Sequence, residues 1–558
     1  MSRTSKQARA LEPPPSGEES EAEPRKRRAL AAPALLVLGL IAVYAPSLGG
    51  GFLNLDDPWL IDRNPVFRTP TWAGLVAIWT DFSMPGRLNV GAEYLPLRDT
   101  SVWLEGLVDG LSPLVMRSVN LAVYAAAVLL LRAALRRALG ARPSVELITA
   151  LFAFHPLHVE SVAWLAERKD VLALLFSAGA LFVHMGRARH RDRLTALLVL
   201  CACLSKAQSV VVVGLLLAFD VLAQRPLKLA NYAAPTAVAA ICALLHAWVG
   251  HVVHMTTALA GGTRAHAAFM LGEIIARYLD SLVWPAHLSI YYDTPSRIAL
   301  TPLGFWGYAL LSAWGIAALY YFRRGGRSAG HLLAAWLCFW VPLLPVSQVL
   351  FPLQNRMADR YQMFSVLALG LLAAWAVEQA LARLRNREAA PRANDERWLC
   401  LAFVPLLCWF ALASARRAWR FADSARLFAD ATQKTERNLL APYMWASALE
   451  ENGDATGAES AYLETLRRTR RSEDAGRRAT NNLARLYARQ GRLTETQALL
   501  VRGRARWPDD PKLLSNLSVV EGRLGHAALA ASLAQELRQR FPEFHSGQRS
   551  LSDLYTGP

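Results

Sequence analysis

Ionisable side chains crowd the segment His155-Pro-Leu-His-Val-Glu-Ser-Val-Ala-Trp-Leu-Ala-Glu-Arg-Lys-Asp170, which lies between two long apolar runs. Ionisable groups at membrane depth cost several kcal/mol each, so they usually face a cavity or a pathway and serve a function. The imidazoles could donate hydrogen bonds or carry protons, and the cations could bind a phosphate. A solvated loop between helices is the other interpretation. The candidate site residues of this segment are His155, His158, Glu160, Arg168 and Lys169.

An acidic pair, Asp56-Asp57, follows the first apolar run in the segment Gly51-Phe-Leu-Asn-Leu-Asp-Asp-Pro58. Two confined neighbouring carboxylates cannot both ionise cheaply, so one could have a raised pKa and act as a base, or the pair could share a cation. A turn that caps a helix is the alternative. Later in the same loop, Arg98 and Asp99 precede an amphipathic stretch, residues 103–111, that could lie in the membrane interface.

Two further cations complete the set of candidates. Arg360 and Asp359 belong to the segment Gln354-Asn-Arg-Met-Ala-Asp-Arg-Tyr361, where an arginine fork could clamp a phosphate or simply reach the interface beside a tyrosine. Lys206 ends a short apolar run, where it could contact a lipid phosphate or extend to the membrane surface.

A divalent metal is compatible with this set, because oxygen and imidazole ligands suit Mn²⁺ or Mg²⁺. Its ligands would be Asp56 and Asp57 with His158 or Glu160. The spacing does not demand a metal. The six cysteines all lie in apolar runs without a C-x-x-C spacing, which indicates neither a disulfide framework nor a thiolate metal site.

The elements that must hold these residues are membrane helices. The chain has 558 residues, of which 53% are hydrophobic, and its mean hydropathy is +0.20, so its core requires lipid as a solvent. The net charge of +17 does not indicate nucleic acid as a partner, because the arginines form short clusters between apolar runs. Such clusters are a topology signal.

About eleven membrane crossings are predicted, each compared with the roughly 20 apolar residues that a spanning helix needs. They lie near residues 30–48, 114–131, 145–162, 170–186, 194–205, 207–223, 229–250, 303–322, 332–351, 362–382 and 398–414. The fifth and sixth could form one hairpin or a broken helix. Six basic clusters mark a cytoplasmic side, which leaves the candidate site residues and the C-terminal region outside the cytoplasm. No small-residue cleavage site follows the first run, which favours an uncleaved anchor.

The predicted domains are a disordered cytoplasmic tail (1–29), a membrane domain (30–415) with its first outer loop at 50–112, and a C-terminal helical domain (416–558). In the last of these, Gly453, Gly491 and Gly525 each mark a helix–helix turn, and the last two are 34 residues apart. That period is typical of tetratricopeptide repeats, although plain helical hairpins are the alternative. Stacked repeats would provide a concave surface for a peptide or a protein.

Together these motifs resemble the bacterial relatives of the transmembrane and tetratricopeptide-repeat O-mannosyltransferases, which are membrane glycosyltransferases of the GT-C fold. The resemblance extends from about Gly51 to the repeats. It rests on the acidic pair, on the signature His155 to Phe176 with Glu167-Arg-Lys-Asp-Val171, on Leu204-Ser-Lys206, on Tyr278-Leu-Asp-Ser-Leu-Val-Trp-Pro-Ala-His-Leu288, on Leu344-Pro-Val-Ser347 and on Met357-Ala-Asp-Arg-Tyr361. The chain departs from the usual family pattern at Tyr124, at Ala207-Gln208 and at Gln362-Met-Phe, which puts donor or acceptor preference in doubt.

The resemblance implies an all-α fold, namely a polytopic GT-C-like membrane helix bundle followed by a tetratricopeptide-repeat α-solenoid. It also implies transfer of a hexose, mannose-like, from a polyprenyl-phosphate-linked donor to Ser or Thr of extracytoplasmic proteins. Asp56 or Asp57 would be the catalytic base. The donor phosphate would be bound by Arg360, Lys169 and Arg168, with His155 and His158 as hydrogen-bond donors or proton carriers and Lys206 as a further candidate.

The implied partners are the lipid-linked sugar, the lipid bilayer and a protein or peptide acceptor held by the repeats. Composition favours a bacterial inner membrane, with the N-terminus in the cytoplasm and the repeats in the periplasm. Two other functions fit the sequence. One is a membrane-anchored scaffold whose transferase-like domain is inactive, and the other is a glycosyltransferase that acts on lipid or polysaccharide.

Overall fold

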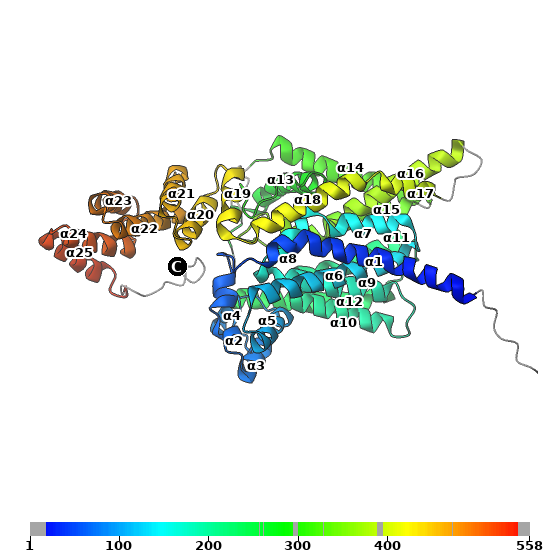
Figure 1. Ribbon diagram of the computed structural model, residues 1–558, viewed down its shortest axis with the longest axis horizontal. Helices are drawn as coiled ribbons and strands as arrows, with labels where there is room; N and C mark the ends of the chain where they lie inside the picture. The colour runs from blue at the N-terminus through cyan, green and yellow to red at the C-terminus, as the bar shows by residue number, and fades with distance from the viewer. Residues whose placement is uncertain are drawn as a thin grey trace, which may run out of the picture.

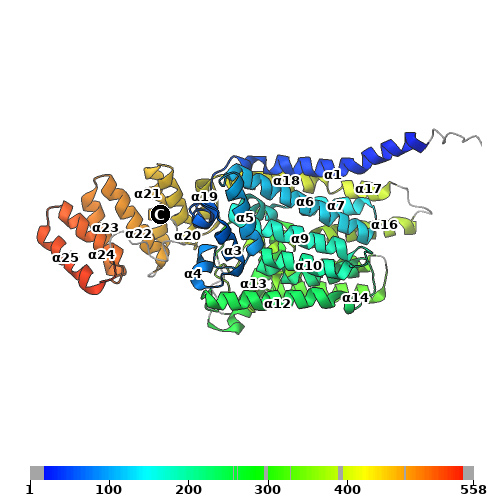
Figure 2. The ribbon, with the colours of Figure 1, turned by 90° about the horizontal axis from the view of Figure 1, so that it is seen from below.

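The computed structural model describes residues 18–255, 257–259, 262–293, 299–326, 328–387, 394–470 and 473–544. Over these residues all regular structure is helical, as the sequence predicts. Figures 1 and 2 show a bundle of long helices and, extending from one of its ends, an array of short helices. The N-terminal part of α1 (Glu18–Leu48) extends beyond the opposite end of the bundle.

The bundle is built from long and short apolar helices. Besides α1 they are α6 (Pro113–Leu139), α7 (Pro143–Ala153), α8 (Val159–Ala163), α9 (Arg168–His184), α10 (Arg191–Ser205), α11 (Val212–Leu222), α12 (Ala230–Val252), α13 (Arg264–Val283), α14 (Pro302–Arg324), α15 (Ala329–Trp340), α16 (Leu367–Arg387), α17 (Asp395–Leu401) and α18 (Val404–Arg420). Six stretches among the described residues are long and apolar enough to cross a membrane, in α1, α6, α12, α14, α16 and α17–α18. The chain is therefore an integral membrane protein.

One predicted span is broken within its length, and two neighbouring spans are divided at a single residue. The run 145–162 is helical only to Ala153, and the chain then continues through the turn Pro156–His158 and the short α8. Pro156 explains the interruption, because proline lacks an N–H donor and restricts the residue before it. The fifth and sixth runs are separate helices that meet at Lys206, whose backbone is extended.

The ends of the membrane domain also differ from the prediction. Residues 18–29 were expected to be disordered but belong to α1, while residues 1–17 lie outside the described part of the chain. Acidic residues at a helix start are favourable to the helix dipole, and alanine and arginine are strong helix formers. At the other end α18 runs to Arg420, past the predicted boundary at residue 415.

The first loop, between α1 and α6, is largely helical. It contains the single turn Pro58–Asp62 and the helices α2 (Pro65–Arg68), α3 (Trp72–Thr80), α4 (Met84–Asn89) and α5 (Pro96–Val108). Asn64, Thr71 and Ser83 each accept a backbone N–H with their side chains at the starts of α2, α3 and α4. The loop lies at the end of the bundle from which the short helices extend (Figures 1 and 2).

The C-terminal array consists of helices packed in sequence order. They are α19 (Ser424–Lys434), α20 (Leu440–Glu451), α21 (Ala455–Arg468), α22 (Asp474–Arg489), α23 (Leu493–Arg506), α24 (Pro511–Arg523) and α25 (Ala527–Arg540). Gly453, Gly491 and Gly525 lie between the helices of three hairpins and all have positive φ, which a residue with a Cβ rarely adopts. The turns are thus where the sequence predicts them, and the assignment to tetratricopeptide repeats stays a prediction.

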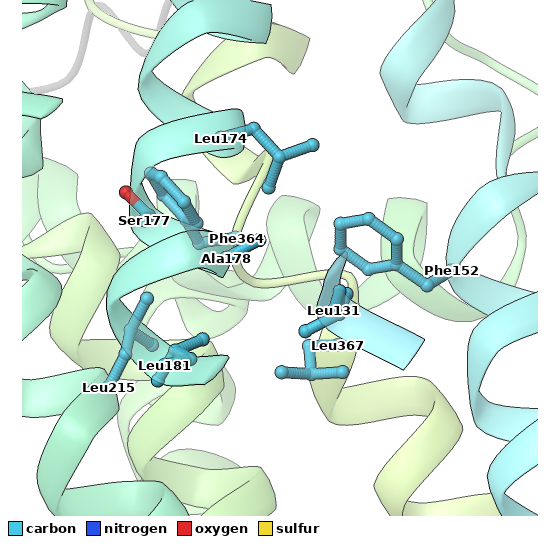
Figure 3. A pocket seen from close by; sticks show the side chains of 9 residues that line it. All are labelled: Leu131, Phe152, Leu174, Ser177, Ala178, Leu181, Leu215, Phe364 and Leu367. Atoms are coloured by element: carbon cyan, nitrogen blue, oxygen red, sulfur yellow. The ribbon is translucent and has the colours of Figure 1, made fainter. Parts of the chain in front are cut away.

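A pocket inside the bundle has an apolar lining (Figure 3). Its lining residues come from α6, α7, α9, α11, the start of α16 and the chain just before it, and are Leu131, Phe152, Leu174, Ser177, Ala178, Leu181, Leu215, Phe364 and Leu367. No titratable side chain lines it. Chemistry that requires charge must therefore take place elsewhere.

Candidate active site

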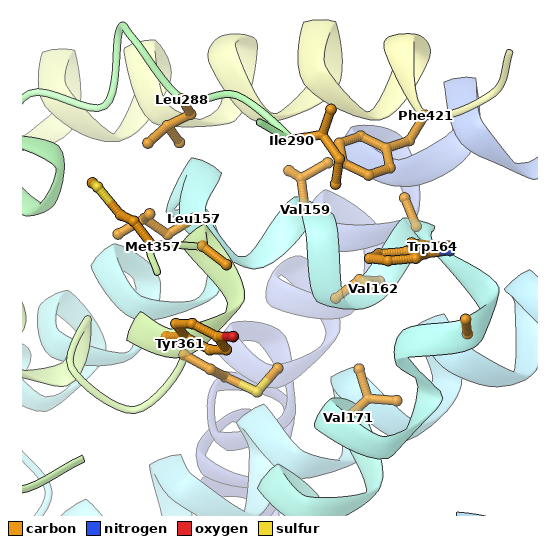
Figure 4. Packing of buried hydrophobic residues seen from close by; sticks show 14 of the residues in the cluster. Leu157, Val159, Val162, Trp164, Val171, Leu288, Ile290, Met357, Tyr361 and Phe421 are labelled. Atoms are coloured by element: carbon orange, nitrogen blue, oxygen red, sulfur yellow. The ribbon is translucent and has the colours of Figure 1, made fainter. Parts of the chain in front are cut away.

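Apolar packing holds the histidine-rich segment in place. Figure 4 shows Val159, Val162 and Trp164 of this segment together with Ile290 and Phe421, which come from the chain after α13 and from the end of α18. All are buried in one hydrophobic cluster. The segment is thus fixed between the bundle and the start of the C-terminal array.

Both histidines are buried and hydrogen-bonded at both ring nitrogens. His155 lies 3.0 Å from the Leu282 carbonyl through Nε2 and accepts the Leu157 N–H at Nδ1. His158 lies 2.9 Å from the Tyr124 hydroxyl and 3.0 Å from the Met363 carbonyl. Each histidine thus connects separate elements of the bundle, and its role toward a donor phosphate stays a prediction.

Arg168 is likewise committed to buried partners. Its guanidinium pairs with Glu105 at 2.6 Å, donates to the Asn120 side chain at 2.8 Å and donates to the Met116 carbonyl at 2.9 Å. These contacts join α9 to α5 and α6. Arg168 is therefore fully engaged by protein partners here, and its place in a phosphate clamp stays a prediction.

Asp57 is buried at the base of the first loop. Its two carboxylate oxygens accept the backbone N–H groups of Leu53 at 2.9 Å and Ala166 at 3.0 Å. Burial raises the pKa of Asp57 to about 7, although these hydrogen bonds and Arg117 act in the opposite direction. On α6, Arg117 also donates to the carbonyls of Gly50 and Gly51. Asp57 and Arg117 together fix the start of the loop against the bundle.

Asp56 has a different environment, although it is the neighbouring residue. The residue as a whole is partly exposed, and its carboxylate accepts the Trp59 indole N–H at 3.3 Å. Burial raises the pKa of Asp56. The nearby Glu167 also raises this pKa, whereas the cations Lys169 and Arg360 lower it. The raised pKa and partial exposure are what a general base requires.

A chain of ion pairs runs through Arg360. Its Nη1 lies 2.5 Å from Glu160 Oε1, its Nε lies 3.2 Å from Glu167 Oε1, and its guanidinium lies over the Trp164 ring. In the part of the chain that the structure describes, Nη2 of Arg360 has no hydrogen-bond partner. That nitrogen is a donor available to a phosphate oxygen.

Lys169 links this chain of ion pairs to the first loop. Its Nζ lies 2.8 Å from Glu93 Oε2 and 3.9 Å from Glu167 Oε1. Burial alone would raise the pKa of Glu93, but Lys169 and Arg98 outweigh it and lower that pKa to about 2. Lys169 and Glu93 are both partly exposed, so this end of the ion-pair chain faces outward.

The remaining candidates are paired nearby. Lys206 forms an ion pair with Asp170, whose other oxygen accepts the Ser161 hydroxyl. Arg98 lies 2.5 Å from Asp99 and donates to the Val90 carbonyl. Burial raises the pKa of Asp99 to about 6 even though Arg98 lowers it.

Arg417, Tyr292 and Glu93 belong to the site but were not among the sequence candidates. Asp359 lies 2.5 Å from Arg417 and accepts the Tyr292 hydroxyl, and Arg417 lies 3.5 Å from Glu160. Arg417 sits in the last turn of α18 among ordinary interfacial arginines, so only its burial distinguishes it. A charged side chain buried this fully requires partners of opposite sign.

No three His, Cys, Asp or Glu side chains among the described residues form a group that could hold a metal ion. His158 is separated from the acidic pair by its own contacts with Tyr124 and Met363. The proposed metal ligands Asp56, Asp57 and His158 are therefore not brought together in this structure.

The geometry defines a membrane protein with a partly exposed acid and two cations at one end of its helix bundle. Sequence comparison gives its relatives. Over 527 residues the chain is 22% identical to protein O-mannosyl-transferase TMTC3 of Mus musculus, with 85% of this chain and 54% of that protein covered. It is 29% identical to TMTC1 of Mus musculus (34% and 22% covered) and to F38B6.6 of Caenorhabditis elegans (34% and 28% covered).

The chain is thus similar to these protein O-mannosyl-transferases, as its motifs predict. It spans about half or less of the length of these curated relatives. No protein-family model matches it. Among solved structures it matches the Archaeoglobus fulgidus oligosaccharyltransferase tethered with an acceptor peptide, at 15% identity and a TM-score of 0.37, with 77% of this chain and 58% of that chain covered.

Proposed function

We propose that this protein is a membrane glycosyltransferase that moves a hexose from a polyprenyl-phosphate-linked donor to Ser or Thr hydroxyls of proteins outside the cytoplasm. The observation that carries the proposal is Asp56, a partly exposed residue whose carboxylate has a raised pKa and is within electrostatic reach of Lys169 and Arg360. Kinship with protein O-mannosyl-transferases supports the reaction class and the protein acceptor.

In this reaction the acceptor hydroxyl oxygen forms a bond to the anomeric carbon, and its proton passes to Asp56. The bond from the anomeric carbon to the phosphate oxygen breaks, and its electron pair leaves with the lipid phosphate. Lys169 and Nη2 of Arg360 stabilise the departing charge. Attack from the side opposite the phosphate inverts the anomeric centre.

The acid and the cations lie on separate elements that meet at one end of the bundle. Asp56 belongs to the first loop, Lys169 begins α9, and Arg360 precedes α16. The C-terminal array starts at the same end, which supports its role in presenting protein acceptors (Figure 1). The six basic clusters of the sequence support a cytoplasmic N-terminus, and composition supports a bacterial inner membrane.

The test is complementation of a gene deletion with wild-type protein, with Asp56→Asn or with Asp62→Asn. Asp62 is a matched control, because it lies in the same loop and pairs with the exposed Arg68. Hexose additions on Ser and Thr of envelope proteins are then measured by mass spectrometry. We expect restoration by wild-type and Asp62→Asn but not by Asp56→Asn.

Other outcomes would reject this function. Equal restoration by Asp56→Asn would remove Asp56 as the base. If wild-type protein restores a hexose only on lipid or polysaccharide, the acceptor class is wrong. If it restores no hexose on any acceptor, the chain acts as a scaffold.

A further inference from the structure

The first helices of the two outer hairpins of the array, α22 and α24, carry the same surface pattern. Four positions on α22 follow one another at steps of four, three and four residues, so they lie on one side of the helix. They are Arg478, Asn482, Arg485 and Arg489. The residues 34 positions later, on α24, are Lys512, Asn516, Val519 and Arg523. Each set thus begins and ends with a cation and has an asparagine in second place.

The two sets also share their exposure and lie side by side. In each set the first two residues are half-buried and the last two are exposed. Leu483 and Leu517, which directly follow the two asparagines, are both buried in the hydrophobic core. The Asn516 side chain on α24 donates to the Asn481 side chain on α22 at 2.9 Å. The two sets therefore form one surface, which we call the α22–α24 face.

The exposed cations of the α22–α24 face exceed the carboxylates that neutralise them. Arg485 and Arg489 share the single carboxylate of Glu450, at N–O distances of 3.2 and 3.4 Å. Within the part of the chain that the structure describes, Arg523 has no ion-pair partner. Exposed cations that outnumber their partners attract an anionic ligand over roughly a Debye length, about 8 Å at physiological salt.

The two asparagines of the face provide acceptors for a peptide main chain. Asn482 Nδ2 donates to the hydroxyls of Tyr443 and Tyr462 at 3.4 and 3.3 Å, and Asn516 Nδ2 donates to Asn481. Among the described residues, Oδ1 of Asn482 and Oδ1 of Asn516 have no hydrogen-bond partner. A side-chain amide oxygen accepts a backbone N–H from any residue except proline. Such acceptors between cations match a polypeptide that carries acidic side chains.

We propose that the α22–α24 face binds an extended acidic polypeptide segment that crosses both helices. Its main-chain N–H groups bind Asn482 and Asn516, and its carboxylates pair with Arg489 and Arg523. Packed helices are about 8–10 Å apart. A polyproline II chain has three residues per turn and advances about 3.1 Å per residue, so every third side chain points the same way roughly 9 Å further on. Acidic residues three apart therefore reach equivalent sites on α22 and α24.

The position of the array favours a polypeptide over a lipid surface as the ligand. Figures 1 and 2 show α22 and α24 beyond the end of the helix bundle, away from the apolar helices that cross the membrane. Binding of an acidic segment requires no sugar transfer. The further step, that the bound segment belongs to the protein that receives the hexose, rests on the proposed function.

The test uses the full chain in phosphatidylcholine nanodiscs and fluorescent peptides that repeat either Asp-Ser-Ala or Asn-Ser-Ala. A third peptide has the composition of the first, with its aspartates grouped at one end. The main variant combines Arg489→Gln with Arg523→Gln. The matched control combines Arg502→Gln on α23 with Arg538→Gln on α25, which removes the same charge from exposed side chains of the same two hairpins. Fluorescence anisotropy measures binding at low and at high salt.

We expect the unsubstituted chain to bind the regular aspartate peptide at least about tenfold more tightly than the asparagine peptide, with a smaller difference at high salt. The main variant should bind the aspartate peptide about tenfold more weakly, and the control should stay within about twofold. Equal affinity for the aspartate and asparagine peptides, or equal weakening in both variants, would overturn the proposal. Equal affinity for the regular and grouped peptides would also overturn it. Displacement of the peptide by phosphatidylglycerol vesicles would assign the face to a lipid surface instead.

Two further variants separate this test from folding and from catalysis. Arg523→Gln alone breaks no ion pair of the described chain and should weaken binding by about threefold, so it replaces a double variant that unfolds early in a thermal assay. Asp56→Asn should bind the aspartate peptide as tightly as the unsubstituted chain does. If the peptide binds as expected but no hexose is transferred by the unsubstituted chain, the proposed function fails while this binding surface stands.

Discussion

Two adjacent aspartates have unequal environments. Asp57 accepts two backbone N–H groups and is buried, whereas Asp56 is partly exposed and lies within the influence of Lys169 and Arg360. The sequence predicts the pair but cannot separate its members, because their difference arises from which side of one turn each side chain occupies. We therefore propose that Asp56 accepts the proton and that Asp57 holds the loop in place.

Asparagine substitutions should separate these roles. We expect Asp56→Asn to lower kcat by at least about 100-fold with unchanged thermal stability, since general base catalysis supplies that much. Asp57→Asn replaces one of the two accepting oxygens with an NH₂ group, so one backbone N–H loses its acceptor, which should cost roughly 1–3 kcal/mol of stability. Steady-state transfer assays measure kcat, and thermal unfolding in detergent measures stability. Loss of activity in a fully stable Asp57→Asn protein would reverse the assignment.

The pH dependence of kcat/KM should report the pKa of Asp56. The base must be deprotonated, so activity rises with pH through a pKa that burial and Glu167 raise above the ordinary value. Glu167→Gln removes a repelling charge and should move the acidic limb to lower pH. Lys169→Gln removes an attracting charge and should move it to higher pH. Each shift should be about half to one pH unit.

As a control, Glu495→Gln, an exposed substitution on α23, should leave the limb in place. Identical limbs in all four proteins would show that a group other than Asp56 controls the profile.

At the scale of elements, hydrophobic runs predict the helices well and polar interruptions poorly. The runs at 30–48 and 229–250 are single helices, as predicted. The run 145–162 is broken after Ala153, and the hydrogen bonds of the following segment go to α13, to the chain before α16 and to the first loop instead of along its own helix. Such long-range partners are invisible in a local pattern, and so is the pairing of Arg417.

Arg417 at the end of α18 should act as a positioning residue. It holds Asp359 and stands near Glu160, the partner of Arg360. Arg417→Lys keeps the charge but loses the planar fork, so we expect the KM for the lipid-linked donor to rise by about tenfold with a smaller change in kcat. Arg420→Lys on the same helix, partly exposed and paired with Asp430, is the matched control. Equal KM values in both variants would make Arg417 structural only.

The outer helices of the array should serve the acceptor alone. Helix α20 contacts the first loop, because the Asn54 side chain donates to Glu451 at 3.2 Å, so a truncation must keep it. Deleting residues 471–558 keeps α19–α21. We expect unchanged binding of the lipid-linked donor and at least about tenfold weaker use of protein acceptors, since stacked helices supply their binding surface. Loss of donor binding in a stably folded truncation would refute this division of roles.

At the scale of the whole molecule, the bundle and the array are firmly joined. Asp293, in the chain after α13, accepts the backbone N–H groups of Glu436, Arg437 and Asn438 just before α20. Lys434 donates to the Leu288 carbonyl at 2.7 Å, and α18 leads from the bundle almost directly into α19. The sequence predicts the two domains, but this junction depends on residues more than 140 positions apart.

A rigid junction of this kind fixes the distance between the helical array and Asp56. If the array grips one segment of an unfolded client, the hydroxyl that reaches Asp56 must lie a set number of residues away along the client chain. Mapped modification sites should then share a common spacing from the gripped segment, and lengthening the client between the two should move the sugar to a new serine. Asp293→Ala, which releases the three N–H groups, should widen that spacing into a range, as site-resolved mass spectrometry would register.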